Sequence, residues 1–240
     1  MIRKAGFQLE RYPNYAYQLE RNEDYIRRMR IIANNNINVL FDIGANAGQF
    51  ATQMRQLGYT KKIVSFEPVQ KAFERLESVS STDSNWTINN YALGDQNCTD
   101  IINVAGNFQS SSVLKMLPMH VESVPTSKYV GQEEIEIRKL DSVFDLFCNE
   151  GDSVMVKVDT QGYEKHVIDG AEKSLKRVKV LQLEMSILPL YENEMLFIDM
   201  VDYLERKGFK LFSLENSLWN AKTGQLMQVD GIFCSANCMQ

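Results

Sequence analysis

The chain has 240 residues, a formal net charge of −5, and a composition of 44% hydrophobic and 24% charged residues. These values are typical of a globular domain and exclude a disordered or fibrous chain. No apolar run approaches the roughly 18 residues that cross a bilayer, and the acidic balance disfavours a general basic surface, so we expect neither a membrane span nor a nucleic-acid partner.

The first segment, residues 1–36, is predicted to be a helical appendage to the domain that follows it. Tyr25, Met29 and Ile32 fall on one face of a helix. Two interpretations stay open: a helix that only packs on the domain, and a helix that also caps a substrate cleft.

Residues 37–240 are predicted to form one domain in which short β-branched runs alternate with longer helical patterns. The predicted strands are 39–43, 63–66, 86–91, 154–158, 178–184, 209–214 and 229–234. The predicted helices are 46–57, 69–79, 163–175, with an interruption near Gly170, and 194–207. A short helix is also predicted between the third and fourth strands, with Leu140, Phe144 and Phe147 on one face.

This alternation predicts an α/β domain with a mostly parallel sheet and helices on both faces. The last two strands have no helix between them, so they can lie antiparallel. Seven strands in this arrangement predict a Rossmann-like class I methyltransferase fold, whose last strand is antiparallel.

One long stretch, residues 103–133, breaks the pattern. It is polar, has little periodicity and contains Pro118 and Pro125. Because long irregular segments inside compact domains are usually functional, we predict a lid over the site.

A glycine-containing loop follows the first predicted strand, where open α/β sheets bind their ligands. It contains Asp42, Gly44, Asn46 and Gly48. The glycines allow a tight turn and a close helix start, but the dinucleotide motif needs a glycine where Asn46 stands. The loop therefore suits a nucleoside without a pyrophosphate, and Asp42 could engage an ammonium group, directly or through water.

Two further acidic residues follow later strands. Glu67 ends the second strand, where a carboxylate can accept hydrogen bonds from both ribose hydroxyls. Asp95 follows the third strand and is well placed for an adenine amino group, although Gly-Asp turns are also common without a function.

Together with these motifs, Lys139-Leu140-Asp141 and the run from Lys157 to Glu164 resemble the FkbM family of S-adenosylmethionine-dependent methyltransferases over residues 37–235. The resemblance implies a carbohydrate or natural-product O-methyltransferase. It also implies that S-adenosylmethionine is held by a set of six residues, namely Asp42, Gly44, Asn46, Gly48, Glu67 and Asp95. The chain departs from the family at Gln161, where Glu is usual.

Charged residues gather around the fourth strand of the predicted sheet. Lys157 and Asp159 share one side of that strand, with Glu164 in the helix after it and Glu184 at the end of the next strand. These four are the candidate catalytic residues, and their alternative role is a structural ion pair.

Asp159 has two possible catalytic roles. It could position or deprotonate a hydroxyl, or it could hold a divalent cation with Glu184 and the amide of Gln161. We favour the first role, because no dense set of metal ligands is visible in the sequence.

The predicted activity is transfer of a methyl group to a hydroxyl of a small-molecule or glycan acceptor. A nicotinamide-dependent enzyme and a non-catalytic S-adenosylmethionine-binding domain are the alternatives. Four cysteines without zinc spacing fit reduced thiols, so we expect a cytoplasmic protein.

Overall fold

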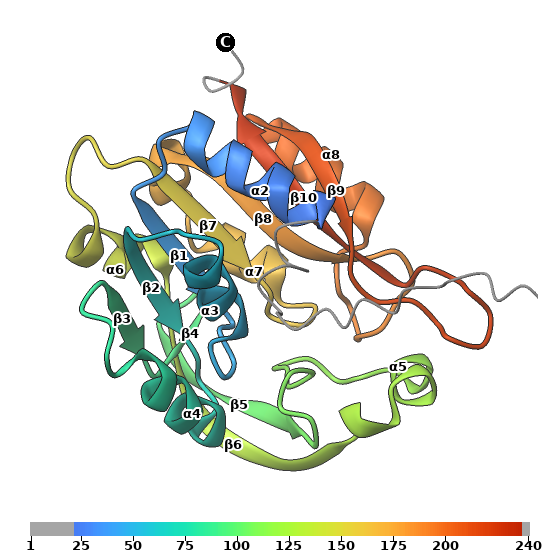
Figure 1. Cartoon of the computed structure of the whole chain (residues 1–240). Coiled ribbons are helices and arrows are strands. Elements are labelled where there is room, and N and C mark those ends of the chain that lie inside the picture. Colours follow the sequence, from blue (N-terminus) through green and yellow to red (C-terminus); the bar gives the residue numbers. More distant parts are fainter. Residues whose placement is uncertain (1–21, 237–240) are drawn as a thin grey trace, which may run out of the picture.

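The computed structural model describes residues 22–236, which form a seven-stranded sheet between two layers of helices (Figure 1). The strand order is β3-β2-β1-β7-β8-β10-β9. This order confirms the predicted α/β fold. One half of the sheet runs from β1 through β2 to β3, and the other runs from β7 through β8 and β10 to β9.

The main-sheet strands are β1 (Val39–Ile43), β2 (Lys62–Phe66), β3 (Trp86–Asn89), β7 (Val154–Val158), β8 (Val178–Ser186), β9 (Phe209–Asn216) and β10 (Gln228–Ser235). The α-helices are α2 (Glu23–Asn34), α3 (Gln49–Gln56), α4 (Gln70–Ser80), α5 (Pro118–Ser123), α6 (Leu140–Phe147), α7 (Glu164–Asp169) and α8 (Phe197–Arg206). Short 3-10 turns cover Pro125–Ser127 and Ser174–Arg177.

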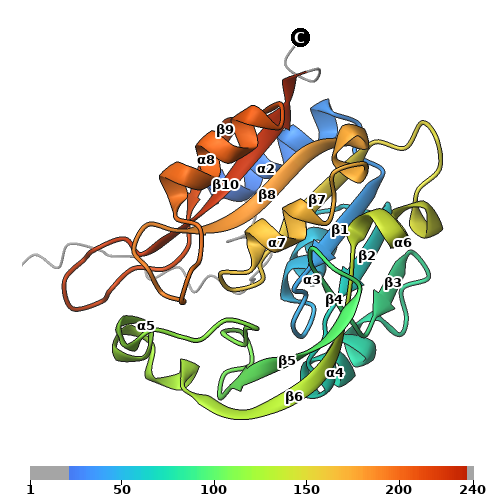
Figure 2. The same ribbon diagram turned by 180° about the vertical axis from the view of Figure 1, so that it is seen from behind.

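Helices cover both faces of the sheet, as the views from the two sides show (Figures 1 and 2). The apolar core on one face joins the sheet to α2, α3 and α4, for example through Ile32, Met54 and Leu76. The core on the other face joins it to α6, α7 and α8, for example through Phe144 and Leu204. Strands β1 and β7 are buried along their whole length, as expected of central parallel strands.

Strand β10 runs antiparallel to both of its neighbours, β8 and β9. The prediction of an antiparallel last strand is therefore confirmed. Because β10 enters the sheet from the opposite direction, its first residues lie at the edge where the parallel strands end. That edge carries the candidate site.

A second, three-stranded sheet is built from β4 (Ala92–Leu93), β5 (Cys98–Ala105) and β6 (Tyr129–Arg138). Both ends of the stretch predicted to be irregular, residues 103–133, therefore belong to paired strands. The sequence pattern missed β5 because its first four residues are exposed and carry no alternation. The non-strand part, residues 106–128, carries α5 and extends below the edge of the main sheet (Figure 1).

The predicted N-terminal appendage is described only from residue 22, and residues 1–21 lie outside the described part. Helix α2 begins with a side-chain cap from Asn22, whose Oδ1 accepts the backbone N–H of Asp24 at 2.9 Å. Ile31 and Ile32 are buried in the core, as the helical periodicity predicts.

Candidate active site

A cavity of about 580 Å³ lies at the carboxyl ends of the parallel strands. Its walls come from the loop after β1, the ends of β2, β7 and β8, and the start of β10, together with α2 and the segment 106–128. This volume is typical of a small-molecule site. Its place agrees with the rule that open α/β sheets bind ligands outside the carboxyl ends of their strands.

The loop after β1 contains three left-handed residues, Gly44 with φ 76°, Asn46 with φ 48° and Gly48 with φ 83°. A Cβ atom on Gly44 would lie 1.9 Å from the carbonyl oxygen of Asp159, so only glycine lets β1 and β7 approach this closely. Asn46 lines the cavity, and its Oδ1 accepts the backbone N–H of Ala47 at 2.8 Å. The glycine therefore lets the loop after β1 lie directly against the end of β7, beside the cavity.

Glu67 lies at the end of β2, lines the cavity and is 5% exposed. Its two carboxylate oxygens accept backbone N–H groups, Oε2 from Asn46 and Oε1 from Val69, both at 2.8 Å. Burial raises the pKa of Glu67 to about 7 despite these hydrogen bonds. Because each oxygen can accept a further hydrogen bond, Glu67 can still receive hydroxyl donors from a ligand.

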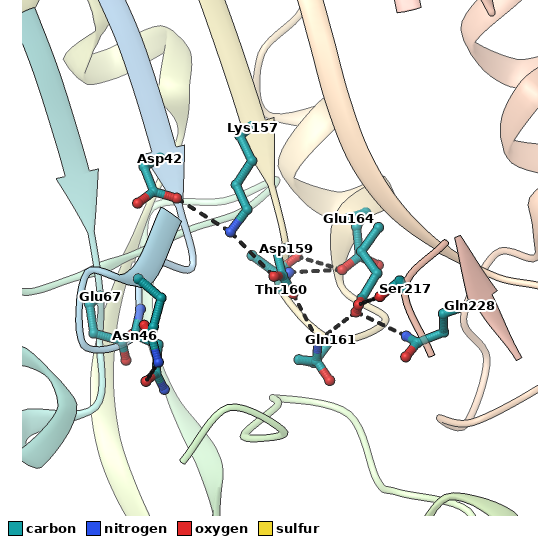
Figure 3. A network of polar contacts seen from close by, with 12 residues as sticks. Asp42, Asn46, Glu67, Lys157, Asp159, Thr160, Gln161, Glu164, Ser217 and Gln228 are labelled. Atoms are coloured by element: carbon teal, nitrogen blue, oxygen red, sulfur yellow. Dashed lines mark hydrogen bonds and ion pairs between the residues drawn. The ribbon is translucent and has the colours of Figure 1, made fainter. Parts of the chain in front are cut away.

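A buried lysine connects two carboxylates, as Figure 3 shows. Lys157 Nζ lies 3.3 Å from Oδ1 of Asp42 and 3.2 Å from Oδ2 of Asp159. Asp42 is fully buried and does not line the cavity, whereas Lys157 and Asp159 do. Burial favours the neutral lysine, but Asp159 and Asp42 outweigh it and raise the pKa of Lys157.

Gln161 bridges two carboxylates with its side-chain amide. Its Nε2 donates to Oδ1 of Asp159 at 2.8 Å and to Oε2 of Glu184 at 2.6 Å. Its Oε1 accepts the hydroxyl of Tyr191 at 2.8 Å. The usual family Glu could not donate these hydrogen bonds, so the departure at Gln161 matches its surroundings here.

This arrangement does not fit the predicted divalent-ion alternative, which used the amide oxygen of Gln161. The amide presents its nitrogen, not its oxygen, to Asp159 and Glu184. Between residues 22 and 236, no group of three or more His, Cys, Asp or Glu side chains is arranged to hold a metal ion.

The structure brings Lys157, Asp159 and Glu184 together at the cavity. Glu164 does not line the cavity and instead contacts the loop between β7 and α7. Glu164 Oε1 accepts the backbone N–H of Thr160 at 2.8 Å and of Gly162 at 3.2 Å. Burial raises its pKa to about 7. This geometry suits a positioning residue that holds the loop carrying Gln161.

Besides Asp42, two more of the six residues assigned to the cofactor, Gly48 and Asp95, do not line the cavity. Gly48 begins α3 with φ 83°, and a Cβ there would lie 3.0 Å from side-chain atoms of Leu76 and Trp86. Asp95 follows β4, where its Cα would lie 3.3 Å from a Cβ on Gly170. Gly48 therefore allows close packing of α3 against α4 and β3, and the roles of Gly48 and Asp95 in cofactor binding stay predictions.

The cavity also contains residues that sequence reasoning missed: Arg28, Gln182, Glu215, Gln228 and Asp230. Arg28 of α2 forms a buried ion pair with Glu215 of β9, so α2 does contribute to the cavity wall. None of these residues belongs to a motif. The only available signal was the antiparallel end of the sheet, which places the start of β10 beside the end of β8.

The strand order, the glycine loop and the acidic residue after β2 define a class I methyltransferase-type domain. The chain matches the Methyltransferase FkbM domain over residues 42–211 and belongs to that family of methyltransferases. No helix within residues 22–236 has the length and apolar character needed to span a membrane.

Known proteins share parts of this sequence and fold. The 2-O-methyltransferase NoeI of Sinorhizobium fredii is 25% identical over 175 residues, which cover 69% of this chain and 70% of that protein. The FkbM methyltransferase structure from Methylobacillus flagellatus has a TM-score of 0.50 and 14% identity, covering 81% of this chain but only 43% of that one. A methyltransferase structure from Mesorhizobium loti also has a TM-score of 0.50, with 8% identity over 90% of this chain and 99% of that one.

Proposed function

We propose that this methyltransferase transfers the methyl group of S-adenosylmethionine to a hydroxyl of a carbohydrate or natural-product acceptor. The observation that carries the proposal is that one cavity joins the loop of Gly44 and Asn46, and Glu67, to the carboxylates of Asp159 and Glu184. The sequence relative named as a 2-O-methyltransferase supports transfer to oxygen. A cytoplasmic location stays an expectation from the sequence.

The cofactor end of the cavity fits a nucleoside. Glu67 would accept the ribose hydroxyls, the backbone at Gly44 and Asn46 would lie against the amino-acid portion, and Ala92 and Leu93 line the cavity beyond β2. Asp42 would affect the bound cofactor only through its ion pair with Lys157, because Lys157 lines the cavity and Asp42 does not. S-adenosylmethionine supplies an activated methyl group, so the protein must orient the acceptor and remove its proton.

The opposite end of the cavity is suited to a hydroxylated acceptor. Asp159 and Glu184 present carboxylate oxygens, which accept hydrogen bonds from hydroxyl groups. Lys157 forms an ion pair with Asp159, and Gln161 links Asp159 to Glu184 through two hydrogen bonds. These residues would bind and orient the acceptor.

The proposal predicts that Glu67→Ala weakens S-adenosylmethionine binding far more than Glu77→Ala. Glu77 is an exposed glutamate on α4 and serves as the matched control. Loss of a charged hydrogen-bond acceptor costs about 2–3 kcal/mol, or roughly 30- to 150-fold in affinity. Isothermal titration calorimetry measures both variants, and equal affinities would contradict the assignment of Glu67.

Mass spectrometry of the purified protein tests the wider proposal. We expect co-purified S-adenosylmethionine or S-adenosylhomocysteine, whereas NAD would favour the nicotinamide-dependent alternative. Binding of S-adenosylmethionine without methyl transfer to any hydroxylated acceptor would favour the non-catalytic domain.

The segment 106–128 is proposed to cover the acceptor. His120 of α5 is buried, faces the cavity and packs edge-on against Tyr191 with 5.2 Å between ring centroids. Ser123, also on α5, accepts the side-chain N–H of Asn220 at 3.2 Å, which ties the segment to the loop between β9 and β10. The segment therefore connects the two sides of the site.

We expect His120→Ala to raise the Michaelis constant for the acceptor by about tenfold, which corresponds to ~1.4 kcal/mol. Affinity for S-adenosylmethionine should stay unchanged. Glu122→Ala, an exposed change on the same helix, is the control for both measurements. A lid role is excluded if His120→Ala leaves the acceptor kinetics at the wild-type values.

A further inference from the structure

Three carboxylates occupy one cross-strand row at the floor of the cavity. The sheet register places Asp230 of β10 opposite Glu184 of β8 on one side and opposite Glu215 of β9 on the other. Directly opposite residues have Cβ atoms about 4.5–5.5 Å apart, and like charges in such positions destabilise a sheet. The negative charges of the row therefore need counter-charges or hydrogen-bond donors from the surrounding residues.

The two outer members of the row are compensated. Glu215 is paired with the buried guanidinium of Arg28. Glu184 accepts three hydrogen bonds from neutral donors, one at 2.8 Å from Ser217 Oγ, one at 2.6 Å from Gln161 Nε2 and one at 2.9 Å from Gln228 Nε2.

The central member, Asp230, has no such compensation. Within residues 22–236 it forms neither a hydrogen bond nor an ion pair, yet it lines the cavity. Asp159, the carboxylate predicted from the sequence, differs in this respect, since Lys157 and Gln161 engage its two oxygens. Among the carboxylates that line the cavity, Asp230 is thus the one without a hydrogen bond or ion pair within the described residues.

A neighbouring group points to a ligand at the same place. Gln182 lies two residues before Glu184 on β8, opposite Lys157, and lines the cavity. The residue is only 2% exposed, and its Oε1 accepts no hydrogen bond within the described chain. A buried amide oxygen without a donor is costly, so a ligand with several hydroxyl groups would satisfy both Gln182 and Asp230.

We propose that Asp230 is the catalytic base that takes the proton of the acceptor hydroxyl, an inference that rests on the proposed function. The acceptor oxygen forms a bond to the methyl carbon while the carbon–sulfur bond breaks, and the electron pair of that bond stays on sulfur. The hydroxyl proton passes to the Asp230 carboxylate, which later releases it to solvent. Asp159 and Glu184 then position the acceptor.

The electrostatic surroundings suit this role. Burial and then the charge of Asp159 raise the pKa of Asp230 to about 7, with Glu215 adding to the rise and Lys157 and Arg28 opposing it. Glu184 faces Asp230 from β8 and adds a further carboxylate. A base whose pKa lies near neutral pH both accepts and releases a proton readily.

The first test uses the protein without acceptor. A carboxyl whose folded-state pKa is raised stabilises the fold below its unfolded pKa, and this contribution is lost as the pH rises through about 7. Asp230→Asn removes that pH-dependent loss. Its melting temperature should therefore exceed that of the wild type increasingly from pH 4 to 8, by about 4 °C or more at pH 8.

Asp202→Asn, an exposed change on α8, should show no such trend. A melting temperature of Asp230→Asn that falls below wild type at pH 8 would mean that Asp230 braces the sheet, and the proposal would be overturned.

The second test measures turnover on a panel of methyl glycosides, with the one that the wild type methylates fastest as the probe. Asp230→Asn should lower kcat by roughly 10²-fold or more and leave S-adenosylmethionine affinity unchanged by calorimetry. Wild-type kcat in Asp230→Asn would overturn the proposal. A wild-type protein that fails to bind S-adenosylmethionine would instead contradict the proposed function. In that case the melting experiment still tests whether the pKa of Asp230 is raised in the folded protein.

Discussion

Replacing Lys157 with methionine should cost about 3–5 kcal/mol of unfolding free energy, the usual effect of removing one partner of a buried ion pair. Lys157 is 6% exposed, and its ammonium supplies the only ion pair of the fully buried Asp42 within the described residues. Methionine fills a similar volume but leaves the Asp42 carboxylate without a counter-charge. Urea unfolding monitored by circular dichroism measures the loss.

Two further variants separate charge from packing. Lys71→Met, an exposed change on α4, should change stability by less than about 0.5 kcal/mol. Adding Asp42→Asn to Lys157→Met should recover part of the loss, because the uncompensated charge is then gone. If Lys157→Met proves as stable as Lys71→Met, the lysine does not compensate Asp42.

Gln161→Glu should destabilise the protein by about 3 kcal/mol at pH 8, since hydrogen bonds to charged groups contribute about 1.5–3 kcal/mol each. The change removes both donors that hold Asp159 and Glu184 and adds a third carboxylate between them. The loss should shrink toward pH 5, because burial raises the pKa of Glu184 well above its usual value and a protonated Glu184 relieves the repulsion. Thermal unfolding at both pH values measures it.

The same chemical change at an exposed position, Gln225→Glu, should leave stability nearly unchanged. Three carboxylates form a hard-oxygen site, so millimolar Ca²⁺ should restore part of the stability of Gln161→Glu and have no effect on the wild type. Equal stability of the two glutamate variants would show that the bridging amide is dispensable.

The sequence predicted those parts of the site that directly follow a recognisable strand in the chain. Gly44, Asn46 and Glu67 follow strands whose apolar runs are unambiguous, and parallel strands bring their ends to one edge of a sheet. Lys157, Asp159 and Glu184 follow from the same reasoning, and they meet at the cavity.

The rest of the site depends on register and on distant pairing, which a sequence pattern does not contain. Arg28 and Glu215 are 187 residues apart and meet only because α2 packs beside β9. Asp230 lies in a strand without any motif, and its significance comes from the two carboxylates opposite it. The fold was easier to predict than the site because hydrophobic periodicity is local, whereas the balance of buried charges is not.

The position of β10 has a consequence for biosynthesis. In the described chain β9 pairs only with β10, and β10 fills the space between β8 and β9. During translation, therefore, β8 keeps an exposed edge and β9 has no partner until the ribosome has released the residues of β10. A nascent protein that stops before Gln228 would expose that edge to other chains, and we expect it to be a target for chaperones and proteases.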